Sequence, residues 1–280
     1  MNVLTKHMSS VARKIAPAAF LFSVTGAAYA HDIYIWPSFF TASIEESGHI
    51  PVDITASHTT FRPDYAMASD GLEVYGVDGK RLNDTGGFYE GMRRSTFDLP
   101  VTAEGTYGLK YRSAPRYITS YVIGRSEEPK FVMGNKEQTA ADIPSKARDV
   151  KTTTYLSVGM AFVTNNAPTD EALQATGSGF ELIPVTHPAD YVTGEEIVIS
   201  LMRDGAPVAG QDVVIELEGP NYRDQPVVFE LLSDAAGQVT FTPEHGGRYM
   251  TKVLSELKVD SPLTDAELTR VYYAFEVIYE

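Results

Sequence analysis

One histidine in this sequence stands where it could gain unusual chemistry. The first thirty residues hold three basic residues and no acidic one, and their apolar run ends at Ala28-Tyr29-Ala30. A basic start, a short apolar stretch and an A-x-A sequence are typical of a secretory signal peptide. We therefore expect residues 1–30 to be a signal peptide that is cleaved after Ala30, which would make His31 the first residue of the mature protein.

An N-terminal histidine offers one metal ion two nitrogen atoms, the α-amine and the ring Nδ1. Nitrogen ligands suit copper, nickel and zinc. The α-amine has a pKa of about 7.7–8.0, so it gives up its proton to a metal at modest cost. His31 is therefore the first candidate metal ligand. The alternative is an exposed, frayed chain end, because termini are often disordered.

His58 is the second candidate, because one more histidine would complete a site of three nitrogens. It follows a segment of alternating apolar residues that indicates a strand. A plain hairpin centred near Ser47 would place His58 opposite Trp36, about 16 Å from His31 at about 3.3 Å per residue. Contact therefore requires a break in the first strand, and Pro37 is the natural place, because proline favours edges and sheet switches. The alternative is a polar cap at the strand end.

The remaining histidines of the mature chain lie in segments rich in turn-forming residues. His187 stands between two prolines and is the third candidate metal ligand, with an ordinary loop residue as the alternative. His49 and His245 are flanked by glycine or proline, and we expect both to be structural.

The composition limits the class of protein. There is no cysteine, which excludes disulfides, thiolate zinc sites and iron–sulfur clusters. Without the first thirty residues, twenty basic residues remain against 37 acidic ones, a formal charge of −17. That charge argues against nucleic acid and anionic membranes as partners. The mature chain has no apolar segment long enough to span a bilayer, so we expect a periplasmic protein. An uncleaved N-terminal anchor is the alternative.

Short alternating segments separated by Gly, Pro, Asn and Asp recur along the chain and indicate an all-β fold. One of them contains the hairpin-turn dipeptide Asp78-Gly79. We expect two Ig-like or transthyretin-like β-sandwich domains in tandem. The first would cover residues 31–125 and the second residues 180–280, with an irregular connection containing some strand over residues 126–179.

Several segments resemble a known family. Residues 180–280 include "DGAPVAGQDVVI" and "SDAAGQVTF" and resemble a transthyretin-like or carboxypeptidase-regulatory-like sandwich. Together with the start "AHDIYIWPSFF", the chain resembles the bacterial domain-of-unknown-function family 4198. The resemblance implies an exported protein of the kind labelled a periplasmic component related to nickel or cobalt uptake. Family members usually have tryptophan in the strand after the late glycines, where this sequence has Tyr249, which keeps an aromatic anchor.

These features favour a binding protein over an enzyme. The sequence lacks the G-x-S-x-G and H-E-x-x-H motifs and the glycine-rich phosphate-binding motifs. We expect a metal-binding role in uptake or homeostasis of nickel, cobalt or copper through His31, His58 and His187, with an envelope transporter or receptor as partner. The alternatives are an adhesion, interaction or spacer module without metal and, ranked third, a copper monooxygenase built on the N-terminal histidine.

Overall fold

Strands form most of the structure, which confirms the all-β prediction. The computed structural model describes residues 31–279, and the expected signal peptide lies outside these described residues. From His31 onward the chain forms one compact unit. None of the helices within residues 31–279 has the length and apolarity needed to cross a bilayer.

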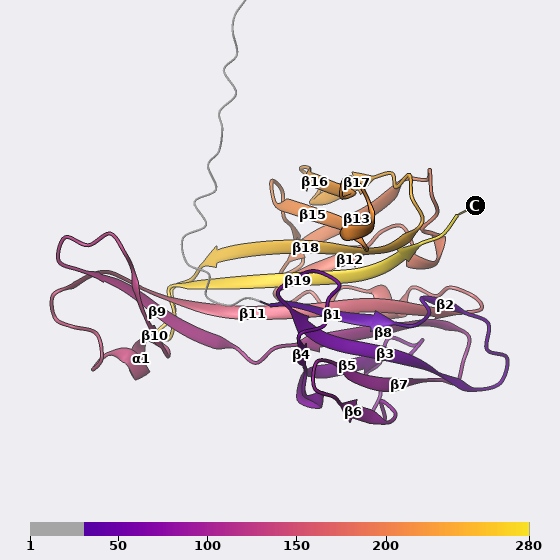
Figure 1. Cartoon of the computed structure of the whole chain (residues 1–280), viewed down its shortest axis with the longest axis horizontal. Helices are drawn as coiled ribbons and strands as arrows, with labels where there is room; N and C mark the ends of the chain where they lie inside the picture. The colour runs from indigo at the N-terminus through magenta and orange to yellow at the C-terminus, as the bar shows by residue number, and fades with distance from the viewer. Residues whose placement is uncertain (1–30, 280) are drawn as a thin grey trace, which may run out of the picture. The chain divides into compact units, whose positions relative to one another are not determined.

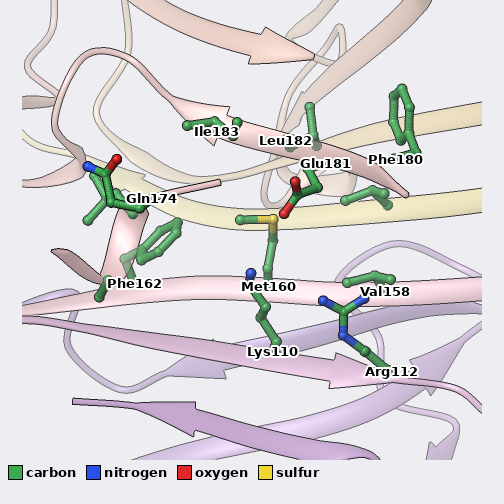
Figure 2. Close-up of a pocket in the computed structure, with 13 residues that line it drawn as sticks. Lys110, Arg112, Val158, Met160, Phe162, Gln174, Phe180, Glu181, Leu182 and Ile183 are labelled. Carbon is green, nitrogen blue, oxygen red and sulfur yellow. The ribbon is translucent and has the colours of Figure 1, made fainter. Parts of the chain in front are cut away.

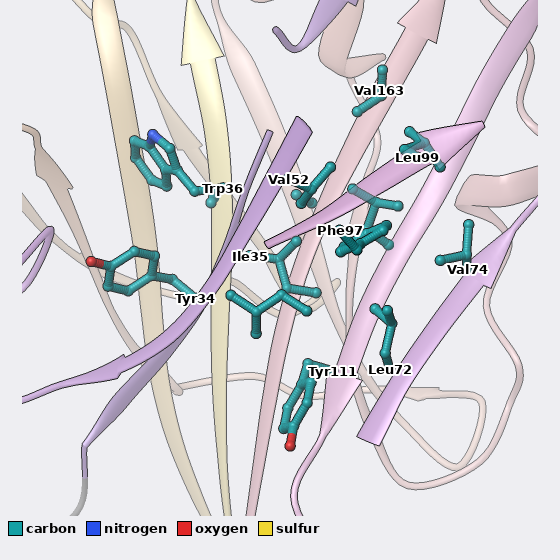
Figure 3. Packing of buried hydrophobic residues seen from close by; sticks show 14 of the residues in the cluster. Tyr34, Ile35, Trp36, Val52, Leu72, Val74, Phe97, Leu99, Tyr111 and Val163 are labelled. Atoms are coloured by element: carbon teal, nitrogen blue, oxygen red, sulfur yellow. The ribbon is translucent and has the colours of Figure 1, made fainter. Parts of the chain in front are cut away.

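The first sheet holds the N-terminal strand. Its order is β1 (Asp32–Pro37), β3 (Gly48–Ser57), β7 (Ser95–Val101) and β6 (Phe88–Glu90), with β4 (Tyr65–Ala66) also paired to β3. Strands β1 and β3 are antiparallel. Along β1, Ile35 points to one side and Tyr34 and Trp36 point to the other, as the alternation of a strand requires (Figure 3).

The central sheet is built around the long strand β11. Its order is β10 (Lys130–Met133), β9 (Arg116–Ile123), β11 (Ala147–Asn165), β19 (Ala266–Val277), β18 (Gly247–Lys258), β15 (Asp212–Leu217) and β16 (Val228–Leu232). Strands β8 (Gly105–Arg112) and β2 (Thr41–Ala42) also pair with β11, and β5 (Leu72–Tyr75) pairs with β8. The sheet therefore takes strands from the beginning, middle and end of the described chain.

The third sheet comes from the second half of the chain. Its order is β12 (Phe180–Pro184), β13 (Ile197–Arg203) and β14 (Ala206–Pro207), with β17 (Gln238–Phe241) paired to β13. The helical elements are short: α1 (Lys136–Thr139), η1 (Ser69–Gly71), η2 (Glu171–Leu173), η3 (Pro188–Asp190) and η4 (Pro220–Tyr222).

The central sheet is covered on both faces (Figure 1). Val163 of β11 and Ala274 of β19 belong to a core shared with the first sheet. Their neighbours Phe162 and Tyr273 point the other way and belong to a core shared with the third sheet. Two sandwiches therefore share one sheet, each with its own hydrophobic core.

This shared sheet corrects the expected tandem arrangement. A boundary near residue 179 would divide the central sheet, because β11 precedes that point and β19 follows it. Residues 126–179, expected to be an irregular connection with some strand, contribute the 19-residue β11. Its alternation is weak for a physical reason: a strand covered on both faces has successive apolar residues, as in residues 160–163, all of which are buried.

Candidate metal centre

The strand register brings His31 and His58 together. In the β1–β3 ladder Asp32 is opposite Ser57, so the next pair outward is His31 and His58. The chain does not form a plain hairpin centred near Ser47, because it leaves the first sheet after Pro37 and pairs with the central sheet as β2 before returning as β3. The switch at Pro37 supplies the break that contact between the two histidines requires.

The two imidazoles meet through their Nε2 atoms. The Nε2 atoms of His31 and His58 are 2.8 Å apart, and the rings are nearly perpendicular, at 89°, with centroids 4.0 Å apart. The Tyr65 ring lies beside both, 4.6 Å from the His31 ring and 5.7 Å from the His58 ring. Because the His58 side chain is 47% exposed, the pair lies at the surface, within reach of a solute.

Asp64 orients the His58 ring. Its Oδ2 accepts a hydrogen bond of 2.9 Å from the His58 backbone N–H and lies 3.4 Å from His58 Nδ1. The backbone hydrogen bond is the main cause that holds the pKa of Asp64 below its usual value, so the carboxylate stays charged. A carboxylate beside Nδ1 favours the tautomer with its proton there, which leaves Nε2 as a lone-pair donor, the arrangement found in metal sites.

The His31 ring is disposed to be neutral. Partial burial lowers its pKa, and the neighbouring His58 lowers it further. A neutral imidazole is the form that binds a metal, because a ligand nitrogen must be free of its proton. The environment therefore reduces the proton competition that a metal would meet at this position.

A constrained loop joins His58 to Asp64. Phe61 has φ of 66°, a left-handed conformation that a bulky residue rarely adopts. Its ring is held against Trp36, with centroids 5.2 Å apart. The buried Ser57 hydroxyl also lies against the carbonyl oxygens of Thr59 and Arg62. Such strain persists only where the surroundings fix it, so the loop presents His58 in a defined position.

A family model described as "Domain of unknown function (DUF4198)" matches residues 28–256, a range that includes His31 and His58. The chain belongs to this family. A comparison with curated proteins gave no match.

The solved structures that the DUF4198 chain resembles are remote. The D0–D1 domain of Intimin has 10% identity and a TM-score of 0.21, with 86% of this chain and 96% of that chain covered. The FN1–FN3 domains of chicken CNTN1 have 9% identity and a TM-score of 0.19, with 89% and 99% covered. A putative membrane anchored protein from Corynebacterium diphtheriae has 12% identity and a TM-score of 0.21, with 89% and 59% covered. These scores are too low to carry an argument.

In this DUF4198 protein, Lys252 of β18 ties both histidine-bearing segments to the central sheet. Its Nζ lies 2.8 Å from Asp32 Oδ2 and 3.0 Å from Glu216 Oε2, and it also contacts the Thr60 hydroxyl. The Thr60 hydroxyl in turn donates to Asp32 at 3.2 Å. Asp32 adjoins His31 in the chain, so one cation fixes the strand end and the loop together.

The structure does not bring His187 to the other two candidates. Its Nδ1 accepts a hydrogen bond of 3.1 Å from the Ala189 N–H, and its Nε2 lies 3.0 Å from the Thr106 hydroxyl. His187 thereby caps the short helix η3 and bridges it to β8. Both ring nitrogens have protein partners, which is the arrangement of a structural histidine.

The other two histidines of the DUF4198 domain also lie apart from the pair. His49 lies within β3 and not in the expected turn. The backbone carbonyl of His245 accepts the Tyr249 hydroxyl at 2.7 Å. Within residues 31–279, no group of three or more His, Asp or Glu side chains is arranged to hold a metal ion. A metal at His31 and His58 would therefore need at least one further ligand.

Sequence reasoning missed Lys110, which lies in a slot between β8, β11 and β12 (Figure 2). Burial lowers the pKa of its amine, whose Nζ is 5.4 Å from the Tyr75 ring centroid. In the sequence, Lys110 alternates with apolar residues, a pattern that indicates a solvent-facing position. The pattern does not reveal the burial, because the covering strand β12 comes from distant sequence. The slot holds about 20 Å³, room for about one water molecule, so Lys110 is a packing feature of this DUF4198 fold.

Proposed function

We propose that this protein is exported and binds a divalent transition metal ion, nickel, cobalt or copper, through its mature N-terminal His31 together with His58. The observation that carries the proposal is the approach of the two Nε2 atoms to 2.8 Å. The nickel and cobalt association that the family resemblance implies belongs to this proposal, as does a role in metal uptake or homeostasis with an envelope transporter or receptor as partner.

The donor set fits such an ion once the two rings have moved apart and the His31 ring has turned. At a metal–nitrogen distance of about 2.0–2.1 Å, two nitrogens at a tetrahedral angle lie about 3.3 Å apart. The imidazoles would have to separate by about half an ångström from 2.8 Å. Chelation with the α-amine uses His31 Nδ1, so the His31 ring would also turn until Nδ1 faces His58. Three nitrogens would then hold the ion, with a position left for water or another ligand.

The surroundings support binding and transfer of a cation. The mature chain has a formal charge of −17, which raises the local concentration of cations. Because the His58 side chain is half exposed, an ion held there would be accessible to a second protein. We therefore propose a carrier rather than an enzyme.

Calorimetric titration with Cu²⁺, Ni²⁺ and Co²⁺ tests the proposal. The protein should begin at His31, which mass spectrometry of the exported protein would establish, and the matched control carries one alanine before His31. We expect the control to bind at least about 100-fold more weakly, because it loses a ligand and even groups that only orient ligands contribute about 10–100-fold. Equal affinity for both forms would rule out the terminal chelate.

A further inference from the structure

A second cavity lies between the first sheet and strands β15 and β18. Its walls include Tyr34 and Trp36 from β1 and Phe61 from the constrained loop, and its volume is about 160 Å³. That volume is several times what one buried water needs. Tyr34 and Trp36 point to the same side of β1, opposite Ile35 (Figure 3). The proposed metal centre uses none of these three aromatic side chains.

One wall of the cavity carries two opposite charges, Glu218 and Arg248, that form no ion pair with each other. Glu218 directly follows β15, and its N–H donates a hydrogen bond of 2.7 Å to the carbonyl of Arg248 on β18. Arg248 is also in register with Glu276 of β19. Opposite charges in such positions usually attract one another. Within residues 31–279, however, no carboxylate lies within 4.0 Å of the Arg248 guanidinium, which lies 5.4 Å from the Trp36 ring centroid.

A second guanidinium lines the opposite wall. Arg94 Nη1 donates 2.7 Å to Asp53, whose other oxygen accepts the Thr96 hydroxyl at 2.7 Å. The carboxylate of Asp53 is therefore engaged on both oxygens. The charges that line the cavity are two guanidiniums, Arg94 and Arg248, and two carboxylates, Asp53 and Glu218, which sum to zero.

We propose that this cavity binds a small zwitterion of the α-amino acid class with an apolar or aromatic side chain. Its carboxylate would bind the Arg248 guanidinium and its ammonium the Glu218 carboxylate. The separated charges of Arg248 and Glu218 match those of a zwitterion, and a guanidinium suits a carboxylate through paired N–H groups. The aromatic walls of Trp36, Tyr34 and Phe61 would contact the side chain, where ring–ring contacts are favourable.

The charge pattern selects against simpler ligands. A plain anion would lie against the carboxylate of Glu218, and a plain cation would lie against Arg248, each with an unfavourable like-charge contact. A neutral apolar molecule would leave both charges without partners. A zwitterion avoids all three costs, since specificity arises as much from disfavoured contacts with competitors as from good contacts with the ligand.

Trp36 makes the test direct, because it is the single tryptophan of the sequence. The metal-free protein is titrated with L-phenylalanine and its tryptophan fluorescence is followed, with calorimetry alongside. We expect a saturable change at up to millimolar concentration. 3-Phenylpropionate, which lacks the ammonium, and phenethylamine, which lacks the carboxylate, should each bind about 10-fold or more weakly, because each loses a charge-assisted hydrogen bond. Equal binding of all three would overturn the zwitterion assignment.

Variants locate the binding site. Arg248→Met keeps the side-chain stem but removes the charge, and Glu218→Gln keeps the shape; each should weaken L-phenylalanine binding about 10-fold or more. Arg203→Met is the matched control, because Arg203 also lies over an aromatic ring, Phe180, at 5.3 Å but outside this cavity. Loss of binding in the control, unchanged binding in both cavity variants, or no saturable change in the unmodified protein would each overturn the proposal. Because the assay is metal-free, it is independent of the proposed metal centre.

Discussion

Two histidine environments in this protein show what separates a candidate ligand from a structural residue. At the open end of the β1–β3 ladder, His31 and His58 face each other through nitrogens 2.8 Å apart. At η3, the Nδ1 of His187 accepts a backbone N–H, and its Nε2 lies beside the hydroxyl of Thr106. In the first environment, the histidine nitrogens face another potential ligand. In the second, they satisfy the polar groups of the fold.

The comparison also distinguishes how each environment is built. His187 has one partner that is close in the chain, the Ala189 N–H, and one that is distant, the Thr106 hydroxyl. The His31–His58 pair depends on a register between two strands and on Lys252, which comes from β18 far along the sequence. The capping contact of His187 is therefore local, whereas its contact with Thr106 and the whole of the other environment require the tertiary fold.

The largest effect that tests this contrast is the loss of metal affinity in His58→Ala. We expect affinity for the tightest-binding of Cu²⁺, Ni²⁺ and Co²⁺ to fall by more than about 100-fold, because a direct ligand should contribute more than the groups that orient it. Calorimetry on protein that begins at His31 provides the measurement. His187→Ala is the control, and it should bind the metal as the unmodified protein does.

The same two variants should rank in the opposite order for stability, with His187→Ala the less stable protein. His187→Ala removes the acceptor of the Ala189 N–H and one of the contacts of the Thr106 hydroxyl, which keeps Thr164 and Thr169. A polar group left unpaired costs about 1–3 kcal/mol. Urea unfolding should show that loss for His187→Ala and a smaller one for His58→Ala. If His187→Ala weakens metal binding as much as His58→Ala does, the division into two kinds of histidine is wrong.

Lys252→Met tests whether a distant cation holds the histidine pair in place. The substitution leaves Asp32 and Glu216 without their shared cation, and we expect the free energy of unfolding to fall by about 2 kcal/mol, less than for a fully buried pair because all three groups are partly exposed. Lys151→Met is the matched control: its exposed pair with Glu256 should contribute less than about 1 kcal/mol.

The distance between the His31 and His58 rings provides a measurement that a change in stability alone would not alter. Nuclear Overhauser contacts between the His31 and His58 rings of the metal-free protein should weaken in Lys252→Met and persist in Lys151→Met. Ring contacts that remain intact in a folded Lys252→Met protein would show that Lys252 stabilises the sandwich without positioning the pair.

Asp64→Asn should have a smaller effect on the same site. The amide side chain of this variant would keep an oxygen for the His58 N–H but lose the negative charge beside His58 Nδ1, so metal affinity should fall about 10-fold, the lower end for groups that orient a ligand. Calorimetry provides the measurement. Asp78→Asn, at an exposed carboxylate paired with Lys80, is the matched control and should leave affinity unchanged. An unchanged affinity in Asp64→Asn would mean that the carboxylate does not set the ring.

The sequence alone was sufficient for the strand content and for the identity of the two facing histidines. Alternation and turn residues report on one strand at a time, and an A-x-A sequence before a histidine is local information. Pro37 also predicted the strand break correctly, because its effect on a ladder is local.

The predictions that failed concern features that depend on residues distant in the sequence. The register of β1 against β3 could not be counted from residue numbers, because β2 leaves for the central sheet between them. The role of β11 was missed because both of its faces are buried, which removes the period-two signal. No sequence pattern pointed to a role for Lys252, Glu218 or Arg248. A charged residue in or beside an alternating strand indicates a solvent-facing position until the covering sheet is known.

The smallest effect that separates the two environments is a pH dependence of stability due to His31. Burial and the neighbouring His58 lower the pKa of His31 in the folded protein below its ordinary value of 6.5. Between that lowered pKa and 6.5 the unfolded chain binds more protons than the folded one, so stability rises with pH across this window and is lost as pH falls through it. Urea unfolding of the metal-free protein between about pH 7.5 and about pH 5 measures this slope. His31→Gln should flatten part of it, and an identical slope in both proteins would show that the His31–His58 contact does not alter protonation.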